Sequence, residues 1–239
     1  MLSDNELRRL ARKNQATEPN TAREYVQHLF LNYLGQKEDS KKFLFKGGTA
    51  LRIVYGSPRF SEDMDFTLPG LPEANVKTTV EAVLSDMGKE GFEFSTEYHK
   101  TSGGHLILAK TSVYDWPLRI ELNLSSRRKK NAHPEFHTIS SPYMPAYSLA
   151  ALSENQLVEE KIGALLARKK PRDVYDLYFI IRASLDKKPV IDNRKKLVEA
   201  IEAVNEANLK PELKSFLPPT HWQTLTHLKT NLLKELSRL

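Results

Sequence analysis

The chain has 239 residues, of which 40% are hydrophobic and 28% are charged, which is typical of a globular protein with one large domain or two small ones. It contains no cysteine, which excludes disulfides and thiolate metal sites, and its polar amino terminus lacks a signal-peptide pattern. No apolar run is long enough to span a membrane, so we expect a cytoplasmic protein with no membrane partner. The formal charge of +6 favours a polyanionic partner.

Helical and strand patterns alternate along the first half of the chain. Apolar residues recur at helical spacing over residues 21–34, where Gly35 ends the run, and a second helix is predicted over residues 73–89. Short apolar or alternating segments predict strands at residues 43–45, 64–68, 92–98, 105–113 and 118–124. This arrangement predicts a mixed sheet with accompanying helices, and therefore the α+β fold class.

The pattern changes after the last of these strands. Residues 126–147 contain the basic run Arg127–Lys130 and three prolines with little periodicity, so we expect a long connection there. From Ser148 onward the apolar residues trace helical faces, with later helices near residues 172–183, 193–207 and 221–238. We therefore predict a mixed-sheet domain with N-terminal helices over residues 1–145, and a helical domain over residues 146–239 that completes a cleft.

A glycine pair followed by two alternating carboxylates is the most informative local pattern. Residues 46–51 read KGGTAL and residues 61–66 read SEDMDF. In a strand, Asp63 and Asp65 leave the same face about 7 Å apart, and a divalent cation relieves their repulsion, with oxygen ligands favouring Mg²⁺ or Mn²⁺. Gly47 and Gly48 let backbone amides approach an anion, and a helix starting at Thr49 points its positive end there. A tight turn and a solvated strand end are the alternative interpretations.

A third carboxylate lies on the strand predicted at residues 118–124. Alternation puts Arg119, Glu121 and Asn123 on one face and three apolar residues on the core face. If this strand neighbours the one with Asp63 and Asp65, Glu121 joins them as a third metal ligand. An acidic trio of this kind suits nucleotidyl transfer with paired cations. An exposed glutamate on a polar strand face is the alternative.

The stretch from Lys46 to Phe66 resembles the signature of the polymerase-beta-type nucleotidyltransferase superfamily, and its wording resembles the AbiEii/AbiGii toxin family within it. Residues 160–168, EKIGALLAR, and 171–177, PRDVYDL, are similar to that family's second motif, so the resemblance spans residues 43–180. It implies a polymerase-beta-type catalytic domain followed by a helical domain, with the nucleotide in the cleft between them. It also implies the toxin of a type IV toxin–antitoxin or abortive-infection pair, a cognate antitoxin, and tRNA acceptor ends as substrates.

The resemblance also assigns roles to the second motif. Lys161 and Arg168 lie two helical turns apart, and we favour phosphate contact for both. Lys161 and Asp176 are predicted catalytic residues beside Asp63, Asp65 and Glu121, whereas Arg168, Arg172 and Asp173 join Lys46, Gly47, Gly48 and Thr49 as predicted nucleotide-binding residues. In the alternative interpretation, Asp173 favours the helix terminus, Arg172 holds Asp176, and the RDxxD segment locks the helical domain to the sheet.

The predicted activity is a metal-dependent transfer of NMP from an NTP to an acceptor hydroxyl, with pyrophosphate released. The basic run Arg127–Lys130 is compatible with an RNA acceptor such as tRNA. One alternative is a catalytically inert protein of the same fold that binds RNA or a partner. Another is a nucleotidyltransferase that acts on small molecules or on protein.

Overall fold

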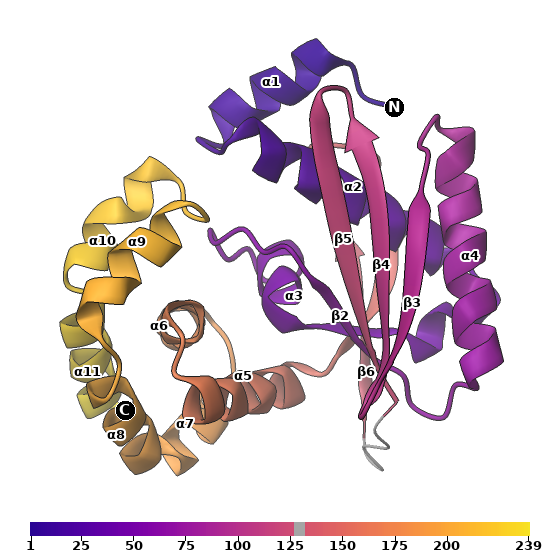
Figure 1. Cartoon of the computed structure of the whole chain (residues 1–239). Helices are drawn as coiled ribbons and strands as arrows, with labels where there is room; N and C mark the ends of the chain where they lie inside the picture. Colours follow the sequence, from indigo (N-terminus) through magenta and orange to yellow (C-terminus); the bar gives the residue numbers. More distant parts are fainter. Residues whose placement is uncertain (127–131) are drawn as a thin grey trace. The chain divides into compact units, whose positions relative to one another are not determined.

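The computed structural model describes residues 1–126 and 132–239, so the basic run Arg127–Lys130 lies outside the described residues. The chain divides into two compact units (Figure 1). Unit 1 comprises Met1–Tyr55 and Phe60–Leu152, and unit 2 comprises Gly56–Arg59 and Ser153–Leu239. A mixed sheet accompanied by helices confirms the α+β class.

Unit 1 is built on a seven-stranded sheet with the order β3-β4-β5-β2-β1-β7-β6. The central strand β2 is antiparallel to β1 and parallel to β5, and β1 is parallel to β7. The hairpins β3-β4, β4-β5 and β6-β7 are antiparallel. The strands are β1 (Leu44–Lys46), β2 (Met64–Thr67), β3 (Ser95–Thr101), β4 (Gly104–Val113), β5 (Trp116–Ser125), β6 (Pro134–Ile139) and β7 (Tyr147–Leu152).

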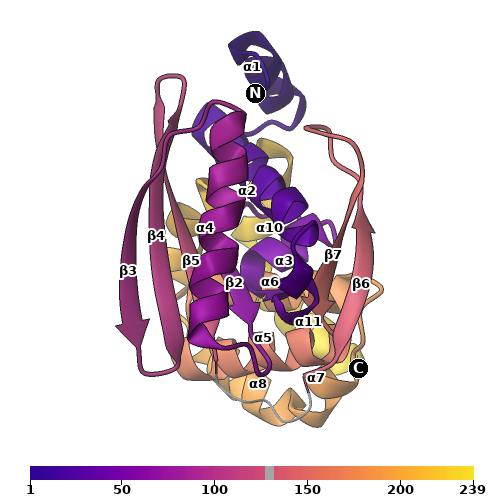
Figure 2. The same cartoon turned by 90° about the vertical axis from the view of Figure 1, so that its right-hand side faces the viewer.

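The first two helices of unit 1 begin where the sequence supplies capping groups. Ser3 and Glu6 form a capping box at the start of α1 (Asp4–Lys13), and the Thr17 hydroxyl caps α2 (Glu18–Gly35). A 3₁₀ helix, η1 (Glu38–Lys42), follows, and then come α3 (Gly47–Ile53) and α4 (Glu73–Lys89). Helix α2 contacts α4, β5 and β7, and α2 and α4 lie across the same side of the sheet (Figure 2).

An aromatic cluster forms the core between α2 and the middle of the sheet. Phe66 of β2 lies 6.3 Å from Phe30 of α2 and 5.3 Å from Phe45 of β1, measured between ring centroids. Phe43 meets the same ring edge-on, and all four side chains are almost fully buried. Phe66 and Met64 therefore point to the core, and the alternate residues of this strand point to the opposite face.

Two expectations for residues 126–152 are wrong. The region predicted to be a connection contains β6, and the helical pattern expected from Ser148 starts only at Glu154, because residues 147–152 form β7. Strand β7 is buried along most of its length beside β1, with Leu44, Ala150 and Leu152 in one apolar cluster. A short strand buried on both faces carries a continuous apolar run, which periodicity does not distinguish from a buried helix.

Unit 2 is helical. Two longer helices, α5 (Glu154–Arg168) and α6 (Pro171–Arg182), pack against each other, and α6 begins with proline at its first position, where the missing N–H costs no hydrogen bond. The remaining elements are α7 (Lys188–Asp192), α8 (Arg194–Glu202), η2 (Glu206–Asn208), α9 (Leu209–Lys214), η3 (Pro219–His221), α10 (Trp222–Thr226) and α11 (Leu228–Arg238). No helix in the described ranges is both long and apolar enough to cross a bilayer.

Candidate active site

The three predicted acidic residues come together through the register of two strands. Strand β2 runs parallel to β5, with Met64 opposite Leu122 and Asp65 opposite Asn123. Asp63 directly precedes the first paired residue of β2, and Glu121 directly precedes its partner Leu122, so continuing the register brings these two positions side by side. Met64 and Leu122 are fully buried, so Asp63, Asp65 and Glu121 share the other face, where all three are partly exposed. The condition set for Glu121, that its strand neighbours the one with Asp63 and Asp65, is therefore met.

The Glu121 side chain makes an ion pair with Arg119, which lies two residues earlier on the same face. Across residues 1–126 and 132–239, no three His, Cys, Asp or Glu side chains form a group arranged to hold a metal ion. The backbone thus brings the acidic trio to one face, while Glu121 is directed toward Arg119. The ligand role of the trio stays a prediction.

Gly47 allows the glycine turn to approach Asp65 closely. Its φ of +82° is in the region that favours glycine, and a Cβ atom there would lie 2.1 Å from Oδ2 of Asp65. Lys46, immediately before it, is the register partner of Asp65 across β1 and β2. The glycine turn and the second carboxylate are therefore close neighbours in the fold.

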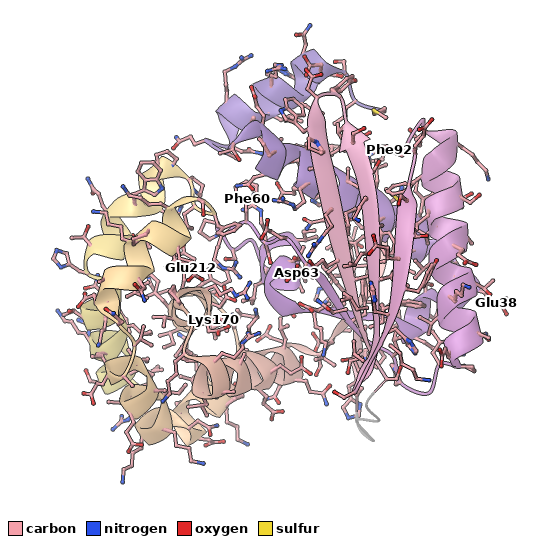
Figure 3. The ribbon with its side chains drawn as sticks, in the orientation of Figure 1. Glu38, Phe60, Asp63, Phe92, Lys170 and Glu212 are labelled. Carbon is pink, nitrogen blue, oxygen red and sulfur yellow. The ribbon has the colours of Figure 1, made fainter. Side chains whose placement is uncertain are left out.

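Thr49 connects the first turn of α3 to the other carboxylate residue. Its buried hydroxyl donates a hydrogen bond to the backbone carbonyl of Asp63. Figure 3 labels Asp63 next to α3. The Thr49 side chain thus fixes the backbone at Asp63. Phosphate binding by the glycine turn stays a prediction, which rests on the backbone amides of residues 47 and 48.

In unit 2, Asp176 is the centre of a buried ionic cluster. The guanidinium of Arg59 donates two hydrogen bonds to it, with Nε 2.8 Å from Oδ1 and an Nη atom 3.0 Å from Oδ2, and Lys161 Nζ lies 2.7 Å from Oδ2. Burial alone would raise the pKa of Asp176, but the two cations lower it to about 2. Burial disfavours the charge on Arg59, yet the adjacent carboxylate raises its pKa.

The rest of the second motif forms a further link between the same two helices. Arg168, at the end of α5, pairs with the buried carboxylate of Asp173 at 2.7 Å, and its side chain stays 48% exposed. Lys161 and Arg168 therefore both face α6, as their spacing predicts. The suggested pairing of Arg172 with Asp176 is wrong, since the Asp176 oxygens are bound by Arg59 and Lys161. Within the described part of the chain, Oδ2 of Asp173 and Nε of Arg172 are buried without a hydrogen-bond partner.

Several buried polar residues near the site escaped the sequence prediction. Glu24 of α2 receives a hydrogen bond from Arg52 of α3 at 3.1 Å and another from the hydroxyl of Tyr143 at 2.8 Å. Burial and the Glu24 carboxylate raise the pKa of Tyr143. Gln27 lies one turn further along α2 and is 2% exposed. For Glu24 and Gln27 the available signal was a polar residue next to the apolar positions of α2.

A hollow of unit 1 lies away from these residues. A pocket of about 310 Å³ lies between α4 and the hairpin β3-β4, where its walls include Lys77, Tyr98 and His105. None of the predicted site residues is among the described residues that line it. The chemistry of the acidic face therefore gives a better guide to the active site than the volume of this pocket.

Comparison with known proteins decides the family. A family model described as nucleotidyl transferase AbiEii toxin, type IV TA system, matches residues 29–236. The chain belongs to this family. The matched range extends from α2 to α11 and includes both motifs, so the AbiEii assignment and the nucleotidyltransferase class predicted from the sequence are confirmed. No curated protein matched the chain.

Solved structures agree with the AbiEii fold. The nucleotidyltransferase toxin MenT4 from Mycobacterium tuberculosis is 18% identical, with a TM-score of 0.72 over 100% of this chain and 91% of MenT4. A putative nucleotidyltransferase from H. pylori is 17% identical, with a TM-score of 0.60 over 93% of this chain and 98% of its own. JHP933 from Helicobacter pylori is 18% identical, with a TM-score of 0.59 over 93% and 95%. At sequence identities this low, the likeness to these structures shows a shared fold and nothing beyond the fold.

Proposed function

We propose that this AbiEii-family nucleotidyltransferase transfers NMP from an NTP to an acceptor hydroxyl at the 3′ end of RNA, with tRNA as the acceptor. The observation that carries the proposal is the β2-β5 register, which pairs Met64 with Leu122 and Asp65 with Asn123 and so brings the strand entry at Asp63 to the part of β5 that carries Glu121. The family's description as a type IV toxin supports growth inhibition as the outcome and a cognate antitoxin as the partner. The cytoplasm supplies both tRNA and NTPs.

The donor set on this face fits a hard divalent cation. Asp63, Asp65 and Glu121 offer only carboxylate oxygens, and the chain has no cysteine to favour a softer metal. These residues would hold Mg²⁺ or Mn²⁺, which when bound neutralises charge on the triphosphate and lowers the pKa of the attacking hydroxyl. To serve as a ligand, Glu121 would have to give up its ion pair with Arg119.

The remaining residues of unit 1 bind and orient the reactants. The backbone amides of Gly47 and Gly48 and the ammonium of Lys46 hold the phosphates of the NTP. The acceptor hydroxyl oxygen attacks the α-phosphorus, the bond to the bridging oxygen of pyrophosphate breaks, and Glu121 accepts the hydroxyl proton. Holding attacker and leaving group in line supplies much of the rate enhancement in such a transfer.

In unit 2, Arg168 is the phosphate-binding candidate that the contacts support best. Its side chain is half exposed, and its five N–H donors exceed what the pairing with Asp173 requires. Lys161 and Asp176 are buried in the cluster with Arg59, which supports a structural role for both. Their participation in catalysis, and nucleotide contacts by Arg172 and Asp173, stay predictions.

The test is to incubate the protein with each α-³²P-labelled NTP together with total RNA, and separately with protein and small metabolites. We expect label on RNA of tRNA size, dependent on Mg²⁺ or Mn²⁺ and lost in Asp63→Ala. Label on metabolites or protein instead would favour the small-molecule or protein transferase. Growth inhibition that survives in Asp63→Ala would favour a binding protein without catalysis.

A further inference from the structure

Three consecutive backbone carbonyls ahead of β2 are each held by a buried side chain. Nε2 of Gln27 lies 3.0 Å from the carbonyl oxygen of Ser61 and 3.0 Å from that of Glu62. The hydroxyl of Thr49 donates to the next carbonyl, that of Asp63. Gln27 is 2% exposed and Thr49 is 1% exposed. The segment 61–63 is thereby fixed from α2 on one side and from α3 on the other.

Asp63 needs this support more than Asp65 does. Asp65 lies within the ladder, with register partners Lys46 on β1 and Asn123 on β5. Strand β2 begins at Met64, so Asp63 lies just outside the hydrogen-bonded ladder. A carboxylate whose backbone is outside the sheet keeps a fixed distance from its neighbours only if other groups hold that backbone.

Helix α2 is a rigid support for this purpose. Its residues are buried on several sides, and Arg23, one turn before Gln27, pairs with Glu62 at 3.1 Å. Glu24 receives the 3.1 Å hydrogen bond from Arg52, which ties α2 to the helix that carries Thr49. Two successive turns of α2 therefore contact the segment that ends at Asp63.

We propose that Gln27 is a positioning residue that sets the place of the Asp63 carboxylate relative to Asp65 and Glu121 for cation binding; this inference rests on the proposed function. The glutamine amide is suited to the task because one nitrogen carries two hydrogens, and each is used on a separate carbonyl. Side chains that orient metal ligands typically change metal affinity on the order of 10- to 100-fold when they are removed.

The test measures Mn²⁺ binding by the electron paramagnetic resonance signal of the free ion, without nucleotide. Gln27→Leu keeps the approximate size and removes both donors, and Gln27→Glu turns a carboxylate toward two carbonyl oxygens. We expect both variants to weaken Mn²⁺ binding by about tenfold or more. The matched control is Tyr147→Phe, which removes the buried 2.7 Å hydrogen bond to His28 of the same helix without touching residues 61–63. It should bind Mn²⁺ as the wild type does.

A second pair of variants tests the same support from α3, should the Gln27 variants not fold. Thr49→Val removes the hydroxyl at nearly constant size and should also weaken Mn²⁺ binding. Thr49→Ser keeps the hydroxyl and should bind Mn²⁺ about as tightly as the wild type does. Hydrogen exchange at residues 61–64 should quicken in Gln27→Leu and in Thr49→Val, but not in Tyr147→Phe.

The outcomes separate this inference from the proposed function. If the wild type binds Mn²⁺ and Gln27→Leu and Thr49→Val bind it equally tightly, the positioning role is wrong while the proposed function stands. If the wild type neither binds Mn²⁺ nor transfers nucleotide, the proposed function and the role that depends on it both fail. If Tyr147→Phe weakened Mn²⁺ binding by the same factor, the cause would be a general destabilisation of α2, and the inference would be wrong.

Discussion

A side chain at position 47 would enter the space that the Asp65 carboxylate fills. Gly47→Ala places a Cβ atom in steric overlap with Oδ2 of Asp65 and also imposes a φ of +82° on an L residue. The backbone change costs about 1–2 kcal/mol of folding free energy. The displaced carboxylate adds a functional loss, so we expect nucleotide transfer to fall by at least about tenfold, measured as label incorporated from α-³²P NTP.

Gly70→Ala separates these two effects. Gly70 has a φ of +67°, and a Cβ atom there would have no heavy atom within 4 Å among the described residues. This variant should lose similar stability in thermal unfolding and keep wild-type transfer activity. Equal activity losses in the two variants would mean that contact with Asp65 is not what position 47 contributes.

For individual residues, the sequence predicts groups that act together when they are close in the chain, but not contacts between residues that are far apart in it. The glycine pair and both aspartates lie within 19 residues, so spacing alone indicates that they act together. Arg59 meets Asp176 across 117 positions, and Gln27 meets Ser61 across 34. Their partners depend on how helices pack, which neither periodicity nor residue type specifies.

Buried charged side chains join helices α5 and α6. A substitution at Asp176 tests whether its carboxylate has a structural or a catalytic role. Asp176→Asn leaves the two cations Arg59 and Lys161 buried without a counter-charge. Breaking a buried pair in this way destabilises by about 3–5 kcal/mol. Lys161→Met leaves the ion pair between Arg59 and Asp176 intact and should therefore lower the free energy of unfolding by less than Asp176→Asn does.

Tryptophan fluorescence makes this measurement specific to unit 2. The chain has two tryptophans, Trp116 in unit 1 and Trp222 in unit 2, so denaturant unfolding in a Trp116→Phe background reports on the helical unit. Loss of nucleotide transfer in Asp176→Asn with an unchanged unfolding midpoint would assign the carboxylate to catalysis instead.

Helix α2 carries a buried histidine that makes the stability of unit 1 depend on pH. Burial lowers the pKa of His28 to about 4, below its ordinary value of 6.5, while Glu24 opposes the shift and Arg52 adds to it. Between these two pH values the unfolded chain binds the proton and the folded chain does not. Stability therefore falls as pH decreases from about 6.5 to about 4, and is unaffected by this group above that window.

The difference between two proteins isolates this contribution. From pH 7 to pH 4.5 the wild type should lose about 2 kcal/mol more unfolding free energy than His28→Asn, which keeps a polar group near the position of Nδ1 beside the Tyr147 hydroxyl. Urea unfolding at the two pH values measures it. Parallel losses in both proteins would assign the pH dependence to other groups.

Among the elements, those with clear periodicity were predicted and those without it were missed. Helix α4 has the predicted bounds, and β4 and β5 differ by one or two residues at their ends. Strands β6 and β7 were missed: β6 lies within a proline-containing, weakly patterned stretch, and β7 is an apolar run. Strand β7 pairs with β6 and with β1, and β1 lies about 100 residues earlier in the chain, so its strand state depends on tertiary pairing that the local sequence does not specify.

For the molecule as a whole, the positive charge is unevenly divided. Unit 2 contains 17 Lys and Arg residues against 12 Asp and Glu, whereas unit 1 contains 19 against 18. In unit 2 the turn between α5 and α6 carries exposed Lys169 and Lys170 next to Arg168. Phosphate contacts release counterions, so affinity for RNA that depends on them falls steeply with salt.

We therefore expect the double variant Lys169→Glu/Lys170→Glu to bind unmodified tRNA more weakly than the wild type, and its tRNA affinity to depend less steeply on salt. Fluorescence anisotropy measures both effects over roughly 50 to 200 mM salt, where phosphate contacts become screened. Arg12→Glu/Lys13→Glu is the matched control, because it changes the net charge equally at exposed positions of α1 in unit 1. That control should reduce affinity less and leave the salt slope close to wild type. Equal effects of the two double variants would mean that tRNA responds to net charge alone, and a larger effect of the α1 variant would assign the RNA-binding surface to unit 1.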